Sequence, residues 1–325
     1  MNKNVILITG SNGEMGKALI QRFMKNKSNA IITLDLNESS NDSIVHDYFH
    51  GSILDNNLLS KINSKYKINS IYHLAAILST KAEQNPEFAS EVNINGTQNM
   101  IEMCISQFEQ YSCVIPFFFP SSIAVYNMNN EINQSVHESM YCSNPNTTYG
   151  KSKLQCELDG VNIEKLNNRI DFRCIRFPGI ISATTIPTGG TSDYAPEMVH
   201  AAAKNNRYDC FVSSKSTLPF IVMPDAILAI EKIMSVSKNK LSSNIYNITS
   251  FSPDVNELFD KVSSFFNQFQ LEYVINKERQ AIVDSWPDSI DDNLARIDWN
   301  WKPKYDFNDA YDRYIIPSIR KYYNQ

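Results

Sequence analysis

The sequence lacks the patterns that mark metal sites, disulfide frameworks and membrane spans. Its six cysteines include no C-x-x-C pair, and its five histidines show no H-E-x-x-H motif or clustered spacing. We therefore expect no metal, and we predict that the cysteines are small buried residues of a reducing compartment. No run of about 18 apolar residues occurs, so no membrane span is expected.

A concentration of basic charge is also missing. The net charge of the 325-residue chain is -5, and its lysines and arginines are spread along the sequence without a basic stripe. Nucleic acid is therefore not expected as a partner. A strand-like run begins at about Val5, which leaves no room ahead of it for a signal or transit peptide. We expect a cytoplasmic protein, although a processed precursor would begin in the same way.

Short apolar runs alternate with amphipathic stretches through the first half of the chain. The strand-like runs cover residues 5–9, 31–34, 70–74, 114–120 and 172–177, and helical stretches include 17–25 and 91–108. Strands that alternate with helices imply right-handed βαβ units and a parallel sheet. The sequence therefore predicts an α/β fold with a doubly wound parallel sheet.

The pattern changes after Pro178. Residues 182–196 are rich in Thr, Gly, Ser and Pro and are predicted to form a loop, whereas 219–249 return to a strand-helix-strand pattern. We predict a nucleotide-binding domain of residues 1–177 plus 219–249. Residues 178–218 plus 250–325 are predicted to form a smaller, discontinuous C-terminal substrate-binding domain.

A glycine-rich turn joins the first predicted strand to the first predicted helix. Gly10, Gly13 and Gly16 form the pattern G-x-x-G-x-x-G, which permits a tight turn and close approach of a pyrophosphate to the helix N-terminus. The next strand ends at Asp35, 19 residues after Gly16. A carboxylate at that place accepts hydrogen bonds from the adenosine ribose and repels the 2′-phosphate of NADP. With no arginine nearby, these residues predict NAD bound to a Rossmann-type sheet.

A tyrosine and a lysine share one face of a predicted helix. Tyr149 and Lys153 are four residues apart, and an ammonium beside a phenol, together with a positive nicotinamide ring, favours the phenolate. Tyr149 would then be a base near neutral pH. Ser121 and Ser122 follow a predicted strand, at the end where open α/β sheets bind ligands. Their other interpretation is a helix cap or turn.

In this order the motifs resemble the extended short-chain dehydrogenase/reductase family over nearly the whole chain. Further similar segments are 74–76, 93–97, 122–126, 176–180 and 295–299. The resemblance assigns Ser122 to the catalytic position beside Tyr149 and Lys153, and it implies a homodimer. The cofactor contacts that it implies are Gly10, Asn12, Gly13, Glu14, Met15, Gly16, Asp35, Ser52, Ile53, Leu74, Ala75, Ala76, Asn93, Tyr149, Lys153 and Ile180.

The substrate half resembles one branch of this family, the short-chain L-threonine 3-dehydrogenases. The similar segments are 73–79, 173–183, 189–195, 218–219, 279–282 and 285–287. This resemblance implies metal-independent oxidation of L-threonine at C3 to 2-amino-3-oxobutyrate with NAD. The substrate contacts that it implies are Ser79, Ser122, Tyr149 and Thr191.

Three positions depart from the family pattern. Ser192 stands where a second threonine is usual, Ser52 where an aspartate often contacts adenine, and Asn127 where a glycine usually follows the aromatic residue. The first change keeps a hydroxyl, and the second weakens the expected adenine contact. The third alters the segment beside the catalytic serine.

Two other functions stay open at this point. A nucleotide-sugar epimerase or dehydratase would use the same scaffold and the same three residues. Residues 184–194 contain no Arg or Lys for a nucleotide diphosphate, which favours a small substrate. A non-catalytic NAD-binding module is the other alternative, and the presence of both Tyr149 and Lys153 argues against it.

Overall fold

A parallel sheet of seven strands is the centre of the molecule. The computed structural model describes residues 4–25, 30–38, 45–128, 135–187 and 189–324. The strand order is β11-β7-β5-β4-β1-β2-β3, and each neighbouring pair is parallel. The strands are β1 (Asn4–Thr9), β2 (Ala30–Asp35), β3 (Asp47–His50), β4 (Lys67–His73), β5 (Ile115–Ser122), β7 (Ile170–Phe177) and β11 (Ile245–Asn247). The predicted Rossmann-type α/β sheet is confirmed.

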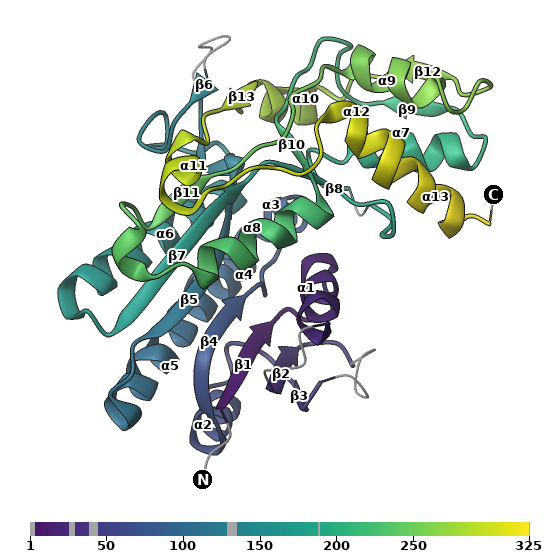
Figure 1. Ribbon diagram of the computed structural model, residues 1–325. Helices are drawn as coiled ribbons and strands as arrows, with labels where there is room; N and C mark the ends of the chain where they lie inside the picture. The colour runs from purple at the N-terminus through teal and green to yellow at the C-terminus, as the bar shows by residue number, and fades with distance from the viewer. Residues whose placement is uncertain (1–3, 26–29, 39–44, 129–134, 188, 325) are drawn as a thin grey trace.

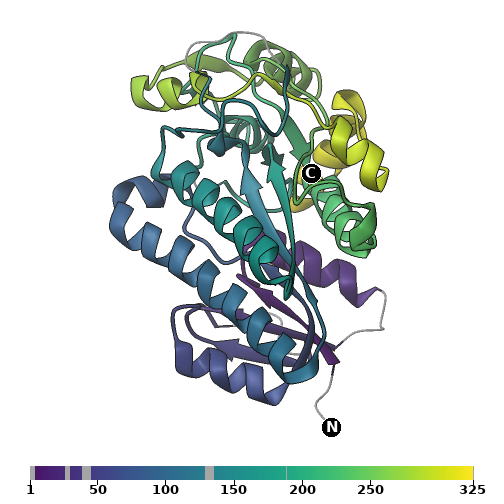
Figure 2. The same ribbon diagram turned by 90° about the vertical axis from the view of Figure 1, so that its left-hand side faces the viewer.

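Helices cover both faces of this sheet (Figures 1 and 2). Val5 and Leu7 of β1 pack into the layer of α2, α5 and α6, whereas Ile6 and Ile8 pack into the layer of α1, α8 and α11. Burial on both faces explains the unbroken apolar run of β1. The helices are α1 (Glu14–Met24), α2 (Asn56–Lys65), α5 (Gly96–Tyr111), α6 (Thr148–Asn167), α8 (Met223–Ser235) and α11 (Asn293–Trp299).

The strand order reverses between β1 and β4, which lie side by side although β2 and β3 separate them in the chain. In open α/β sheets, ligands bind outside the carboxyl ends of the strands at such a point. In Figure 1 the segments after Phe177 that do not belong to the sheet layers lie above these carboxyl ends. The fold thus places the glycine turn, the loop after β4 and the end of β5 at one edge of the sheet.

These remaining segments build a third hydrophobic core, to which residues 123–125 of the first half also belong. Three two-stranded parallel pairs, β10–β8, β12–β9 and β13–β6, lie outside the main sheet. The elements are α3 (Ser79–Gln84), α4 (Pro86–Ser90), η1 (Glu91–Asn95), η2 (Ile123–Val125), β6 (Ser135–Val136), β8 (Gly179–Ile181), α7 (Tyr194–Ala203), β9 (Tyr208–Cys210), β10 (Phe220–Val222), η3 (Lys238–Lys240), α9 (Val255–Ser263), β12 (Leu271–Tyr273), α10 (Lys277–Asp284), β13 (Ser289–Ile290), α12 (Phe307–Asp309), η4 (Ala310–Ile315) and α13 (Ile316–Tyr322). The domain boundaries given above stay a prediction.

Two expectations from the sequence are wrong in part. The loop predicted for 182–196 ends earlier, because α7 begins at Tyr194 and places Pro196 in its first turn, where a missing N–H costs nothing. Four of the six cysteines are buried, but Cys113 is exposed and Cys142 is half-buried. Both lie in connecting segments rather than in an apolar strand or helix face.

Among the residues that the structure describes, no helix is both long enough and apolar enough to span a bilayer. In the same part of the chain, no three His, Cys, Asp or Glu side chains gather in a way that would hold a metal ion.

Candidate active site

The glycine turn after β1 is shaped by two close backbone approaches. Gly10 has a φ of +67°, and a Cβ on it would lie 2.6 Å from the backbone nitrogen of Ala75. A Cβ on Gly16 would lie 2.5 Å from the carbonyl oxygen of Gly10. Helix α1 begins at Glu14 with Gly13 as its N-cap, and the N–H groups of its first turn have no partner inside the helix. The turn therefore offers backbone donors at the carboxyl edge of β1.

The Asp35 carboxylate lies beside this turn and is held by backbone amides. Its Oδ2 accepts from the Asn12 N–H at 2.9 Å, and its Oδ1 accepts from the Asn37 N–H at 3.0 Å. The Asn12 side chain donates to the carbonyl oxygens of Asn37 and Glu38. The structure thus brings together Asp35, Asn12 and the glycines.

The other predicted cofactor residues lie along the same edge, in different environments. The Ala75 N–H donates to the Thr9 hydroxyl at 3.2 Å, which fixes the loop after β4, and Leu74 and Ala76 flank it. The Ser52 hydroxyl accepts from the Leu54 N–H at 3.0 Å, so the residue that replaces the usual aspartate stabilises a turn. Ile53 packs against Gly96, and a Cβ on Gly96 would lie 2.3 Å from Cδ1 of Ile53.

Asn93 and Ile180 are held by regular structure. Asn93 is buried in the π-helical turn η1, where its amide group accepts from the Ile77 N–H at 2.7 Å and donates to the Ser152 hydroxyl at 3.2 Å. Ser152 in turn donates to the Tyr149 carbonyl oxygen. Ile180 is half-buried in β8. The buried Asn93 thus connects the loop after β4 to the helix that carries Tyr149.

The segments that carry Ser122 and Tyr149 are brought together by a close contact between η2 and α6. Ser122 ends β5, and its Oγ accepts from the Ala124 N–H at 3.2 Å, so its own O–H remains available as a donor. A Cβ on Gly150 would lie 2.1 Å from the Ala124 carbonyl oxygen. Neighbouring strand residues point to opposite faces, and Ser121 is buried whereas Ser122 is half-buried. The geometry therefore favours Ser122 of the two serines.

Burial dominates the electrostatics of Tyr149 and Lys153. The Lys153 side chain is 3% exposed, and its Nζ lies 5.6 Å from the centre of the Tyr149 ring and 4.5 Å from that of Phe119. Burial lowers the pKa of Lys153 to about 8 and raises the pKa of the half-buried Tyr149 above its ordinary value. A second positive charge, in addition to that of Lys153, is needed to favour the phenolate of Tyr149, and a nicotinamide ring carries one.

The other two predicted substrate residues, Ser79 and Thr191, lie on segments that touch each other. Ser79 opens α3, and the hydroxyl of the next residue, Thr80, donates to the Gly189 carbonyl oxygen. Thr191 is buried two residues beyond Gly189. The structure therefore brings the segment of Ser79 to the loop of Thr191.

Comparison with known proteins assigns the chain to a family. Residues 6–249 match the NAD dependent epimerase/dehydratase family. The chain belongs to this family. The mitochondrial L-threonine 3-dehydrogenase of Bos taurus is 33% identical over 93% of this chain and 79% of its own length. An uncharacterized epimerase/dehydratase of Staphylococcus haemolyticus is 32% identical over 93% of each chain.

A solved structure in the same family extends the similarity to three dimensions. A monomeric L-threonine 3-dehydrogenase from a metagenome database, in its apo form, has a TM-score of 0.87 at 35% identity. The match covers 98% of this chain and 100% of that one. The resemblance to the extended short-chain dehydrogenase/reductases is thereby confirmed, whereas the predicted homodimer stays a prediction.

Several contacts of this family member were not found from its sequence. Glu83 accepts from the Tyr149 N–H at 3.3 Å and from the Thr148 hydroxyl at 3.0 Å. The Asp193 carboxylate accepts from the N–H groups of Gly189 and Gly190 at 3.0 and 2.6 Å. These contacts hold the first turn of α6 and the loop of Thr191, and no local sequence signal marks them.

Arg279 is a further contact of the same loop. Its Nη2 donates to the Gly190 carbonyl oxygen at 2.6 Å, and its guanidinium lies over the Phe211 ring. The segment 279–282 does resemble threonine dehydrogenases, but the sequence gives no reason for the arginine. The contact explains it as a support of the substrate loop.

Two side chains take environments that the family pattern does not predict. Asn127 donates to the Asn144 carbonyl oxygen and the Asn146 side chain, each at 2.8 Å, and so ties the segment after Ser122 to the segment before α6. Glu14 is hydrogen-bonded by Ser182 and Thr185, and burial raises the pKa of its carboxyl group. Its side chain therefore joins the glycine turn to the segment after β8.

Proposed function

We propose that this chain is an NAD-dependent L-threonine 3-dehydrogenase that oxidises L-threonine at C3 to 2-amino-3-oxobutyrate. One observation carries the proposal. The segments that carry the half-buried Ser122 and Tyr149 meet at the contact between η2 and α6, one helical turn from Lys153, at the ligand-binding edge of the sheet. A relative with this named activity, 33% identical over 93% of the chain, supports the choice of substrate.

The residues present fit NAD. Gly10 lets the loop after β4 pack directly against the glycine turn, where a Cβ would lie 2.6 Å from the Ala75 nitrogen, and the amides of the α1 N-terminus suit a pyrophosphate. The Asp35 carboxylate, oriented by Asn12 and Asn37, suits the two hydroxyls of an adenosine ribose and opposes a 2′-phosphate. When bound, NAD supplies the acceptor for the hydride that leaves C3. We propose that the other cofactor residues predicted from the sequence line the same site.

The side chains of the chain handle the proton and the position of the substrate. The Tyr149 oxygen takes the proton of the C3 hydroxyl while the C3 hydride leaves, so that a carbonyl group forms and the charges balance. The Ser122 O–H donates to the same substrate oxygen, since the Ser122 oxygen accepts from the Ala124 N–H and its proton stays available. Lys153 stabilises the Tyr149 phenolate by its charge and would hold the nicotinamide ribose. Holding these groups in register is the main contribution of the protein.

A small zwitterionic substrate needs polar partners, for which we propose Ser79 and Thr191. The loop of Thr191 is held at Gly189 and Gly190 by Asp193, Arg279 and Thr80. Residues 184–194 carry no Arg or Lys, which suits an amino acid better than a nucleotide diphosphate. We also propose the division into the two domains given above and a homodimeric assembly.

Tyr149→Phe tests this mechanism. The change removes only the phenolic oxygen, so we expect turnover of L-threonine to fall by at least 10²-fold, while NAD binding and the free energy of unfolding are retained. Lys151→Ala, at an exposed position of the same helix, is the matched control and should keep full turnover. Normal turnover in the phenylalanine variant would contradict the role of Tyr149.

A nucleotide-sugar epimerase or dehydratase is the second candidate, favoured by the family description and by the Staphylococcus haemolyticus relative. The same three side chains would serve that reaction. NAD(H) that stays bound through purification, with turnover of a UDP-sugar, would support it. NAD binding without turnover of either substrate class would indicate a non-catalytic module.

A further inference from the structure

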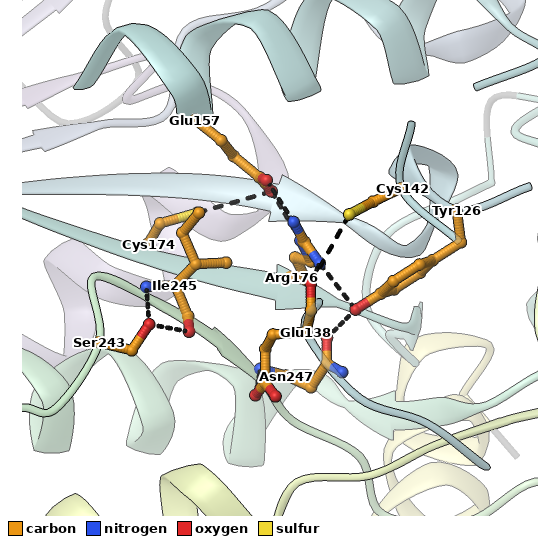
Figure 3. A network of polar contacts seen from close by, with 9 residues as sticks. All are labelled: Tyr126, Glu138, Cys142, Glu157, Cys174, Arg176, Ser243, Ile245 and Asn247. Atoms are coloured by element: carbon orange, nitrogen blue, oxygen red, sulfur yellow. Dashed lines mark hydrogen bonds and ion pairs between the residues drawn. The ribbon is translucent and has the colours of Figure 1, made fainter. Parts of the chain in front are cut away.

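The catalytic helix carries a fully buried acid one turn beyond Lys153. Glu157 is four residues after Lys153 and eight after Tyr149, so the three side chains lie on one side of α6. Its carboxylate is 0% exposed and meets Arg176 of β7, which is 2% exposed. The contact is bidentate, with Nε to Oε1 at 2.9 Å and Nη2 to Oε2 at 2.6 Å (Figure 3).

The same guanidinium also reaches the turn that bears Ser122. Arg176 Nη1 donates to the Tyr126 hydroxyl at 2.9 Å and to the Glu138 carbonyl oxygen at 2.7 Å. Tyr126 directly follows η2, and its hydroxyl donates to the Asn247 side chain of β11 at 2.8 Å. Figure 3 shows these side chains converging on Arg176 from the helix, the turn and the sheet. One ion pair thus connects the helix of Tyr149 to the turn of Ser122.

Stability alone does not account for this pair. Removing two charges from water is costly, and replacing a buried ion pair by apolar residues is often neutral or stabilising. Removing one partner, in contrast, leaves an uncompensated buried charge. A pair of this kind is therefore explained better by what its geometry and charge do for neighbouring groups.

The group next to Glu157 that responds to its charge is Lys153. The titratable groups around Lys153 are Tyr149, Cys156 and Glu157 of α6, Cys174 of β7 and His73 of β4, and the Arg176 guanidinium of β7 pairs with Glu157. Burial raises the pKa of both thiols and of Tyr149, and it lowers the pKa of His73 to about 3. These four groups are consequently neutral at neutral pH. Glu157 lies one turn from Lys153 on the same side of α6, and its carboxylate opposes the fall in the lysine pKa.

We propose that the Glu157–Arg176 pair positions α6 against the Ser122 turn, and that the Glu157 carboxylate keeps the buried Lys153 protonated. Both residues are positioning residues, since neither is placed at the reacting atoms. The expected effect on catalysis rests on the proposed function, whereas the expected effect on the charge of Lys153 does not.

The charge of Lys153 can be followed without substrate or cofactor. An NMR titration of the lysine Cε signals, with the Lys153 signal assigned by its absence in Lys153→Met, gives its pKa directly. Glu157→Gln removes the anion and leaves Arg176 uncompensated, so the pKa should fall by at least about one unit. The double variant Glu157→Leu with Arg176→Met removes both charges without leaving one unpaired, and should give a smaller fall in a folded protein. Asp159→Asn, at a half-buried position of the same helix, should give none.

The positioning role has a separate measurement. In the double variant we expect kcat for L-threonine to fall at least tenfold at pH 7, with the Kd of NAD within about threefold of wild type. An unchanged Lys153 pKa in both Glu157 variants would overturn the electrostatic part, and an unchanged kcat would overturn the positioning part. A wild-type protein that does not oxidise L-threonine would instead overturn the proposed function, and the titration would still decide whether Glu157 sets the charge of Lys153.

Discussion

Gly150 lies at the point where the catalytic helix meets the turn of Ser122. A Cβ there would lie 2.1 Å from the Ala124 carbonyl oxygen, whereas carbon and carbonyl oxygen approach no closer than about 3.3 Å. Gly150→Ala must therefore separate α6 from η2 by roughly 1 Å, because the obstructing atom is backbone. A misplacement of ~1 Å between catalytic groups can cost on the order of 10²-fold in rate. Overpacking of this kind also lowers the free energy of unfolding by about 1–3 kcal/mol.

The assay for this variant separates geometry from folding. Initial rates of NADH formation against L-threonine concentration give kcat and KM, and urea unfolding gives the stability at the same pH. We expect kcat to fall roughly 10²-fold in a protein that remains folded. Lys151→Ala, one residue further along α6 and exposed, should change neither quantity. A Gly150→Ala protein with wild-type kcat would refute the idea that this contact sets the distance between Ser122 and Tyr149.

Three further changes test the charges of the site. Asp35→Asn removes the repulsion of a 2′-phosphate, so the preference for NAD over NADP in kcat/KM should fall by about tenfold; an unchanged ratio would argue against the cofactor assignment. Because burial raises the pKa of Glu14, its charge beside the pyrophosphate site is expected to weaken NAD binding most at high pH. Glu14→Gln should therefore tighten NAD binding a few-fold at pH 8. A gain in NAD affinity that stays the same as the pH falls would contradict the idea that the charge of Glu14 weakens binding. Burial holds the pKa of Lys153 at about 8, below its value of ~10.4 in the unfolded chain. Between these two pH values the unfolded chain binds more protons than the folded protein. The free energy of unfolding therefore rises with pH over this range. Lys153→Met should remove that contribution, roughly 3 kcal/mol between pH 7 and pH 11, and equal pH dependence in urea unfolding of the two proteins would contradict it.

The parts of the fold that follow from local pattern could be predicted from the sequence. Strands β1, β5 and β7 are apolar runs buried on both faces, which is a strong signal, and the glycine turn and Asp35 stand at fixed offsets from two of the strands. Strand β3 was not predicted. Its residues Asp47–His50 are mostly half-buried or exposed at the edge of the sheet, so it has no apolar run to mark it.

In the candidate site, too, some residues could be predicted from local sequence pattern and others could not. Tyr149 and Lys153 follow from helical spacing, and Glu157 continues that spacing by one further turn. The residues that hold the substrate loop cannot be predicted from a repeating spacing of residues along the sequence. Arg279 is 89 residues from Gly190, and Thr80 is 109 residues from Gly189. Contacts of this kind depend on how segments meet across the carboxyl edge of the sheet, which a single sequence does not specify.

One measurement tests the proposed substrate and the proposed cofactor together. Absorbance at 340 nm is followed for the purified protein with L-threonine, L-serine or UDP-glucose, each with NAD and with NADP. We expect NADH to form with L-threonine and NAD, and we expect neither L-threonine with NADP nor UDP-glucose to give a comparable rate. No NADH from L-threonine, together with conversion of the UDP-sugar, would contradict the proposed function.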